Sequence, residues 1–200
     1  LLLRTAVDLG TDAVLVAGGD GTAHLALQVL AGTPTPLGLI PCGTGNDFAT
    51  QLGLRELDAV GAANIIADGF TRKIDLARAT DHNGTEVYFA TVLASGFDSR
   101  VNDRANSMRW PRGNSRYNIS ILLEFLTLRG IAYNIEFELV DGTLERFDED
   151  FVMATVGNGP SYGGGIPICP TAELDDGLLD VTLVRPAGRL RLLRLLPRVY

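Results

Sequence analysis

The order of apolar and polar positions changes character near residue 70. Before that point, two short and continuous apolar runs cover residues 13–17 and 37–40. Such runs are typical of strands that are buried on both faces of a parallel sheet. A glycine turn follows the first run, and residues 23–31 then have the spacing of a helix. The pattern therefore predicts buried strands that lead through turns into helices.

Two further helices are predicted around this pair of strands. Residues 1–9 are closed by Gly10 and residues 56–68 by Gly69, and glycine commonly ends a helix. Strands that alternate with helices indicate a parallel sheet that is covered by helices. The first domain, over residues 1–70, is therefore expected to be an α/β domain.

The second part of the chain, over residues 71–200, has the pattern of antiparallel strands. Asp81-His82-Asn83-Gly84 is a hairpin signal between two apolar segments. Asp141-Gly142 indicates another turn, and one helix is expected over 119–128. The predicted strands share a high content of apolar and β-branched residues, and they cover residues 71–79, 86–93, 131–140, 151–156 and 178–184. We therefore expect a second domain that is rich in β-strands.

The turn after the first strand has the composition of a phosphate-binding loop. It reads Gly18-Gly19-Asp20-Gly21-Thr22. Its glycines let the backbone approach a ligand closely, and the amide groups at the start of the next helix point at an anion. The loop is neither a Walker A loop nor a dinucleotide fingerprint. Asp20 supplies a carboxylate where phosphate and Mg²⁺ would meet, although Asp is also a common helix cap.

A turn of the same kind follows the second strand, in the segment from Pro41 to Ala49. It contains Gly43-Thr44-Gly45 and then Asn46-Asp47, and either of the last two could cap the following helix. Parallel strands present such turns at one edge of the sheet, where α/β proteins bind ligands. The two turns are therefore predicted to form one site. Two capping turns without a ligand are the alternative interpretation.

Composition and charge exclude several classes of protein. The 200 residues are 46% hydrophobic and carry a net charge of −7, which argues against a nucleic-acid partner. No apolar run reaches the length of about 18 residues that a membrane span needs. Two cysteines far apart in the sequence indicate a reducing compartment. Arginines nevertheless gather over residues 100–116, around Met108 and Trp110, and again over residues 185–198.

Four motifs, in this order, resemble the catalytic region of the diacylglycerol kinase family of lipid kinases, in its soluble bacterial branch. The first two are the glycine turns described above. The third is Ala94-Ser95-Gly96-Phe97-Asp98, and the fourth runs from Asn158 to Val181. The resemblance covers nearly the whole chain. It implies an α/β nucleotide-binding domain of the NAD kinase and diacylglycerol kinase kind, next to a β-sandwich domain, with the active site in the cleft between them.

For the two glycine turns, the resemblance implies binding of ATP. The residues that it assigns to the nucleotide are Gly18, Gly19, Asp20, Gly21, Thr22, Ala23, His24 and Leu25 in the first turn and Gly43, Thr44, Gly45, Asn46 and Asp47 in the second. Asp20 is a candidate catalytic residue that could order Mg²⁺ or act as the base. Asp98 is a second candidate acid at the cleft. Many family members have Glu where this chain has Leu25, so a supporting carboxylate is missing here.

For the fourth motif, the resemblance implies a structural Mg²⁺ that is separate from any ion bound with ATP. Its ligands would be the carboxylate of Asp176 and the main-chain oxygens of Glu173 and Leu178, and a hard cation takes such oxygen ligands. Without the resemblance, a plain Asp-Asp-Gly turn is the simpler interpretation. Asn158 and the run Gly163-Gly164-Gly165 are expected to line the same cleft, while a flexible loop is the alternative for the glycines.

The resemblance implies an ATP-dependent kinase that phosphorylates the hydroxyl of diacylglycerol or a related lipid alcohol. The partners would be ATP and a lipid presented by a membrane surface, with no nucleic acid and with a homodimer allowed. The location would be cytoplasmic, peripheral at the inner face of the membrane. An NAD kinase, a sphingoid-type lipid kinase and a non-catalytic nucleotide-binding module stay as alternatives.

The family's first strand and its last strand, which carries an Asp-Gly-Glu motif with the usual base, are absent from the 200 residues. The sequence also has no initiator Met and no signal-peptide pattern. We therefore expect a fragment that is truncated at both ends and that lacks the usual base.

Overall fold

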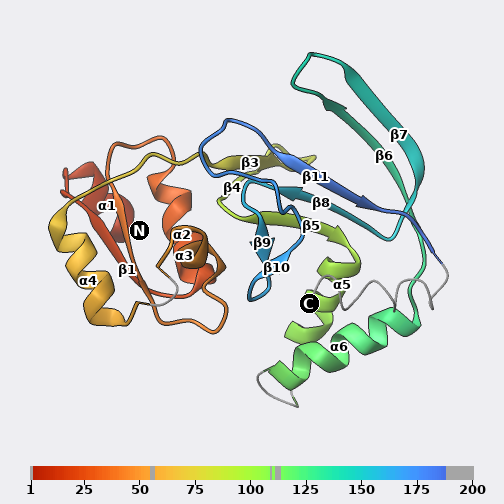
Figure 1. The fold of residues 1–200 in the computed structure, drawn as a ribbon, viewed down its shortest axis with the longest axis horizontal. Helices are drawn as coiled ribbons and strands as arrows, with labels where there is room; N and C mark the ends of the chain where they lie inside the picture. The colour runs from red at the N-terminus through yellow and green to blue at the C-terminus, as the bar shows by residue number, and fades with distance from the viewer. Residues whose placement is uncertain (1, 55–56, 109, 111–113, 188–200) are drawn as a thin grey trace. The chain divides into compact units, whose positions relative to one another are not determined.

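The computed structural model describes residues 2–54, 57–108, 110 and 114–187 (Figure 1). These residues gather in two compact units. Of the described residues, those within 1–92 and 157–180 form the first unit, and those within 93–156 and 181–187 form the second. The basic tail over residues 188–198 lies outside the described residues. The predicted domain boundary near residue 70 stays a prediction.

The first unit is built from a strand pair, four helices and short antiparallel pairs. In chain order its elements are α1 (Leu2–Asp8), β1 (Val14–Gly18), α2 (Asp20–Leu30), β2 (Leu37–Pro41), α3 (Asp47–Gln51), α4 (Ala59–Asp68), β3 (Ala77–Thr80), β4 (Glu86–Phe89), β9 (Ser161–Tyr162) and β10 (Ile166–Pro167). Strands β1 and β2 are parallel, with Val14 opposite Leu37 and Gly18 opposite Pro41. The predicted parallel pair is therefore confirmed.

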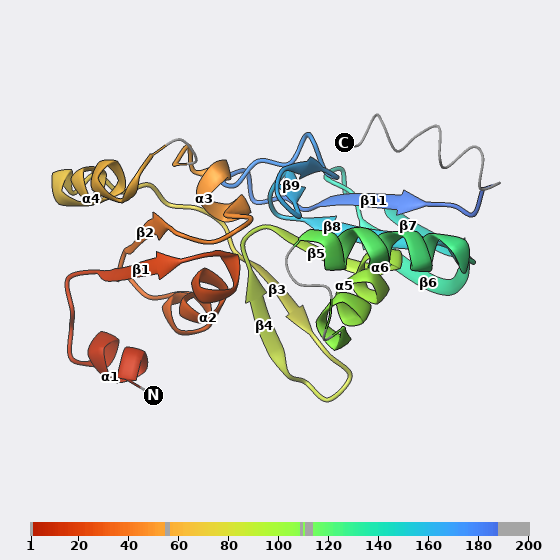
Figure 2. The ribbon, with the colours of Figure 1, turned by 90° about the horizontal axis from the view of Figure 1, so that it is seen from below.

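Helices α2 and α4 lie on opposite sides of this strand pair (Figure 2). Alternate residues of β1 are buried, because one face of the strand packs on α2. The core that results is purely apolar, and its larger members are Val14, Val16, Leu27, Leu30, Leu39 and Phe48. Helix α4 begins after Asp58, which accepts a hydrogen bond from the Gly61 amide, and ends at Gly69 with φ +73°. The parallel pairing and this core thus hold the carboxyl ends of β1 and β2 next to each other.

The second unit joins a three-stranded sheet, a helix pair and a long hairpin. Its elements are β5 (Val92–Gly96), α5 (Phe97–Ser107), α6 (Asn114–Leu126), β6 (Ile131–Glu138), β7 (Leu144–Phe151), β8 (Met153–Gly157) and β11 (Asp180–Val184). The sheet has the order β11-β8-β5. Strands β6 and β7 form an antiparallel hairpin, with Ile131 opposite Phe151. The Phe151 ring is fully buried and makes edge contacts with the Tyr133 and Phe147 rings.

Several elements differ from the sequence prediction. Helix α2 begins at Asp20 rather than at residue 23, so the glycine turn is itself the first turn of the helix. Strand β3 covers Ala77–Thr80, so only the last three residues of the predicted strand 71–79 form a strand. The basic segment after residue 96, for which no helix was predicted, forms α5 with only Val101 and Ala105 buried.

Strand β7 was also not predicted, because its buried face alternates Glu with Phe and gives no continuous apolar signal. No helix among the described residues is both long and apolar enough to span a membrane.

We expect Phe151→Ala to destabilise the protein strongly, because it removes a fully buried ring that contacts two other rings. A change of this kind lowers the free energy of unfolding by about 3–5 kcal/mol. Urea unfolding of the whole protein measures the loss. Val140→Ala is the control, since Val140 is exposed at the end of the same hairpin and should change the stability by less than about 0.5 kcal/mol. Equal effects of the two changes would contradict this account of the core.

Candidate functional site

The two glycine turns touch through their backbones. The Cys42 amide donates a hydrogen bond of 2.9 Å to the Gly18 carbonyl. A Cβ atom on Gly43 would overlap the Gly19 Cα, and a Cβ on Gly19 would lie 3.0 Å from the Gly43 Cα. Glycine at position 43 is therefore required for this approach, and a side chain at position 19 would make a tight contact. The prediction that the turns meet at the carboxyl edge of the sheet is therefore confirmed.

Asp20 links the first turn to the start of α3. Its Oδ1 accepts a hydrogen bond of 2.9 Å from the Phe48 amide. No side-chain cap is present at the start of α2, so Asp20 does not serve there as an ordinary helix cap. Its Oδ2 lies beside Gly45, 3.0 Å from where a Cβ would be. The carboxylate therefore stands between the two turns.

Asn46 closes the second turn on itself. Its Oδ1 accepts from the Gly43 amide at 2.9 Å, and its Nδ2 donates to the Gly43 carbonyl at 2.8 Å. Its backbone is left-handed, with φ +54°, a conformation that Asn tolerates better than most residues. This side chain thus holds Gly43 against the first turn.

Asp47 brings a third segment to the site. Its side chain is buried, and Oδ2 accepts a hydrogen bond of 2.8 Å from the Gly164 amide. Gly163, Gly164 and Gly165 all have positive φ, so this run is a defined turn. Gln51 fixes the same segment, because its Nε2 donates to the Ser161 carbonyl at 2.7 Å. Asp47 Oδ1 has no hydrogen-bond partner among the described residues.

The other nucleotide residues of the prediction lie around this junction. Thr22 and Thr44 are exposed, as the predicted role of their hydroxyls requires. Ala23 belongs to the apolar core, so only its backbone could face a ligand. His24 is half-buried and Leu25 is 68% exposed. Asp98 lies in the first turn of α5, in the second unit, and its catalytic role stays a prediction.

The predicted metal segment is an exposed turn that is fixed from outside by Asp75. The Asp75 Oδ2 accepts from the Gly177 amide at 2.8 Å, and the Asp75 amide donates to the Leu174 carbonyl at 2.7 Å. Asp176 Oδ1 accepts from the Leu178 amide at 2.9 Å, and Glu173 lies on the exposed side of this turn. Asp75 was not singled out from the sequence, because a single acid in front of a strand is no signal.

This turn offers carboxylate and carbonyl oxygens, which are the donors that Mg²⁺ takes. Among the described residues no group of three or more His, Cys, Asp or Glu side chains is placed to hold a metal ion. A metal site here would therefore need main-chain oxygens in addition to side chains. The chemistry of the donor atoms fits Mg²⁺.

Asn158, which was expected to line the cleft, is a buried structural residue. Its Nδ2 donates to the carbonyl oxygens of Asp75 and Ala90, at 3.1 and 3.0 Å. Its own amide donates to the Thr91 carbonyl at 2.8 Å. Asn158 therefore positions Asp75, and through it the Asp176 turn.

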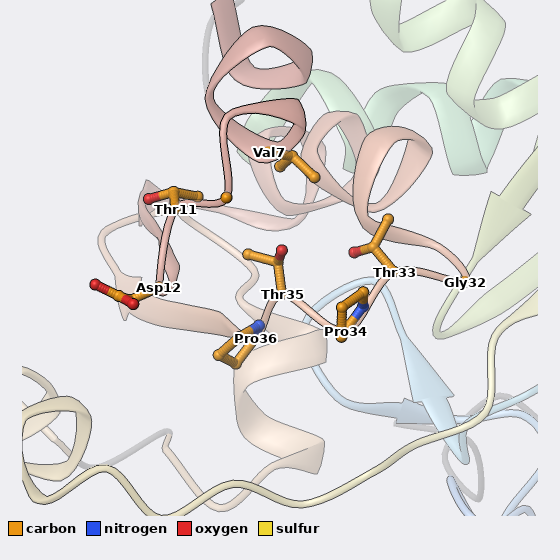
Figure 3. Close-up of a pocket in the computed structure, with 9 residues that line it drawn as sticks. Val7, Thr11, Asp12, Gly32, Thr33, Pro34, Thr35 and Pro36 are labelled. Atoms are coloured by element: carbon orange, nitrogen blue, oxygen red, sulfur yellow. The ribbon is translucent and has the colours of Figure 1, made fainter.

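A cavity of about 480 Å³ lies elsewhere in the first unit (Figure 3). It is lined by residues that precede β1 and β2, among them Thr11, Asp12 and Thr35. This is the amino-terminal edge of the strand pair, opposite to the glycine turns, and Asp12 is its one carboxylate. The cavity shares no residue with the loop junction, so it is not part of the candidate site.

Two protein families match the chain. Residues 1–79 match the diacylglycerol kinase catalytic domain, and residues 91–200 match the YegS C-terminal NAD kinase beta sandwich-like domain. Neither match covers residues 80–90. They support an α/β domain followed by a sandwich-like domain.

Individual relatives agree with these matches. A "Diacylglycerol kinase" of Mycobacterium tuberculosis is 52% identical over 199 residues, which are 100% of this chain and 63% of the relative. A "Probable lipid kinase YegS-like" of Stenotrophomonas maltophilia is 33% identical and covers 90% of this chain, which spans 58% of that relative. The crystal structure of a diacylglycerol kinase from Bacillus anthracis superposes with a TM-score of 0.65 at 28% identity, over 98% of this chain and 62% of that one. The chain thus spans less than two thirds of the relatives it matches.

We expect Asp47→Ala to loosen the glycine turn at residues 163–165, because the Gly164 amide loses its acceptor. One lost hydrogen bond of about 1–2 kcal/mol corresponds to roughly tenfold faster amide exchange at Gly164. Hydrogen exchange of the whole protein measures this rate. Asp58→Ala, which removes an exposed acceptor at α4, is the control and should leave Gly164 unchanged. Unaltered exchange in Asp47→Ala would show that the carboxylate does not hold this turn.

Proposed function

The chain belongs to the diacylglycerol kinase catalytic domain family, and from this premise we propose that the whole protein is an ATP-dependent lipid kinase. Its substrate would be the hydroxyl of diacylglycerol or of a related lipid alcohol. The observation that carries this proposal is the junction of the two glycine turns, in which Asp20 and Asp47 stand at the carboxyl edge of the parallel strands.

The proposed nucleotide site uses backbone amides and hydroxyls more than side-chain cations. Phosphoryl transfer depends mainly on positioning and on neutralisation of the phosphate charge. The first turn of α2 presents its amides at the junction, where the helix dipole favours an anion. Thr22 and Thr44 supply exposed hydroxyls. Mg²⁺, bound together with ATP, would supply the remaining positive charge.

Asp20 is the residue proposed to orient that ion or to accept the proton of the substrate hydroxyl. One of its oxygens is used by the Phe48 amide, so the carboxylate has a fixed orientation. A carboxylate held in one orientation beside the proposed phosphate site suits either role. Asp98 is proposed as a further acid of the reaction. The partners would be ATP and a lipid at the inner face of the membrane.

We expect Asp20→Asn to lower turnover by about 10²-fold or more, in the range that loss of a positioned acid or base gives. The melting temperature should change little, because the Asn side-chain oxygen can still accept from the Phe48 amide. Phosphate transfer from ATP to diacylglycerol by the whole protein is the measurement. Asp58→Asn, at the exposed cap of α4, is the control for a neutralised surface acid. Near-normal turnover in Asp20→Asn would remove Asp20 from the proposed chemistry.

A second expectation concerns the ion at the Asp176 turn. Asp176→Ala should lower the melting temperature and abolish its dependence on Mg²⁺, since a ligand that binds only the folded state stabilises it. The comparison is made on whole protein freed of metal, with Mg²⁺ added back in the absence of nucleotide. Asp180→Ala is the control, because that carboxylate accepts from the Thr171 hydroxyl and lies outside the proposed ligand set. A native protein whose melting temperature ignores Mg²⁺ would contradict the site.

A panel of substrates identifies the molecule that accepts the phosphate from ATP. The whole protein is incubated with ATP–Mg²⁺ and, in separate reactions, with diacylglycerol, a sphingoid base and NAD. Transfer to diacylglycerol supports the proposal as stated. Transfer to the sphingoid base alone or to NAD alone replaces the substrate, and transfer to none of the three contradicts the kinase function.

A further inference from the structure

Helix α6 is packed with its polar side toward the protein. Ser120 and Glu124, four positions apart and therefore on one face, are both buried. Glu124 Oε1 accepts a hydrogen bond of 2.5 Å from Arg104 Nε of α5. Ser120 Oγ donates to the Arg116 carbonyl at 2.9 Å and lies 3.4 Å from Met108 Sδ. The contact between α5 and α6 is thus made by an ion pair and hydroxyl contacts.

The apolar side of α6 points outward. Leu122 is 58% exposed, Leu126 is 53% exposed and Leu123 lies between them at 38%. Leu122 and Leu126 are four positions apart, so they share a face. Tyr117, one turn before Ser120, lies on the other side of the helix, where its hydroxyl donates to Asn102 Oδ1 of α5 at 3.3 Å. A helix at the surface of a globular protein normally has the reverse arrangement, with the apolar stripe toward the core.

An outward apolar stripe of this kind marks a surface that meets a partner. Trp110, four positions before the helix, is 82% exposed, and exposed Trp side chains favour the boundary between lipid and water. No exposed acid of α6 opposes such contact, because Glu124 is the one acid of this helix and it is buried.

The positive charge of residues 100–130 indicates an anionic partner. Residues 100–130 contain six arginines and only two acids, Asp103 and Glu124, although the whole chain carries −7. Among these arginines, Arg129 is exposed just after α6, and the Arg116 guanidinium lies 5.8 Å from the Tyr117 ring centroid. Basic residues beside an apolar surface complement the anionic headgroups and the acyl chains of a bilayer.

We propose that the outward face of α6, formed by Leu122, Leu123 and Leu126, is together with the exposed Trp110 the surface by which the protein docks on an anionic lipid bilayer. The inference rests on the proposed function, since a lipid kinase must reach a substrate that lies in a membrane. A second copy of the chain, or another segment of the protein, would also bury leucines, but neither accounts for the local excess of arginine.

The test compares two pairs of substitutions in the whole protein. Leu122→Glu with Leu126→Glu changes the proposed surface. Val60→Glu with Ile65→Glu, on α4, is the matched control, because these side chains are 66% and 43% exposed. Co-sedimentation uses vesicles of phosphatidylcholine with and without phosphatidylglycerol. The first pair should lower the partition onto phosphatidylglycerol vesicles by roughly tenfold or more, as expected when apolar side chains leave the interface, while the control pair binds like wild type.

A fluorescence measurement tests directly whether this surface meets the bilayer. Trp110 is the single tryptophan of these 200 residues, so the difference between wild type and Trp110→Phe isolates its emission. Quenching of that emission by brominated phospholipid in the vesicles supports the proposal. Bound protein whose Trp110 is not quenched, or unchanged binding of the Leu122 and Leu126 variant, overturns it.

Two further outcomes are decisive. If the milder pair Leu122→Ser with Leu126→Ser lowers the melting temperature as much as Phe151→Ala does, the face is covered by the protein itself and the inference is wrong. If wild type is an oligomer that this pair converts to a monomer, the face joins copies of the chain and the inference is equally wrong.

Phosphorylation of a short-chain diacylglycerol in solution separates the two proposals. Loss of vesicle binding with this activity retained supports the docking surface, whereas a wild type that binds vesicles without any transfer contradicts only the kinase function.

Discussion

The contact between Gly19 and Gly43 is the constraint on which the candidate site depends. Because the two backbones approach without side chains between them, Asp20 can reach the Phe48 amide of the other turn. That bond fixes the start of α3, and Asp47 then lies where its carboxylate meets the Gly164 amide. Three segments far apart in the sequence are thus ordered by one close approach of two glycines. Any side chain at the contact would separate the turns and break this chain of hydrogen bonds.

Both carboxylates at this junction also have a structural task, which distinguishes them from surface acids. A backbone amide donates to each of them. Burial of Asp47 beside a second carboxylate is unfavourable in itself, because a desolvated charge loses the stabilisation of water. Among the described residues, one oxygen of Asp47 is buried without a hydrogen bond. Such an atom is costly to keep unless water, a ligand or an ion meets it.

The sequence predicted the parts of the structure that follow from short-range rules. The two apolar runs became β1 and β2 in parallel register, and Gly69 ended α4 as expected. The same rules could not predict α5, because its polar sequence buries only Val101 and Ala105. The structural tasks of Asp75 and Asn158 were equally hidden, since they depend on contacts with residues about 70 to 100 positions away, and no local pattern encodes such partners. The predicted ligand roles of Glu173, Asp176 and Leu178 stay predictions.

The charges of the loops set the requirements of the proposed chemistry. The segments 18–25, 41–49 and 158–167, which form the junction and its surroundings, contain acids but neither Lys nor Arg. A Walker A loop counters phosphate charge with its own lysine, whereas here the described loops bring Asp20 and Asp47 to the same place. The amides of α2 can offset only part of the charge of a nucleotide, because a helix dipole corresponds to about half an elementary charge. In the proposed function, a divalent cation would offset the charge of ATP beside these carboxylates, and Asp20 and Asp47 would then orient that cation.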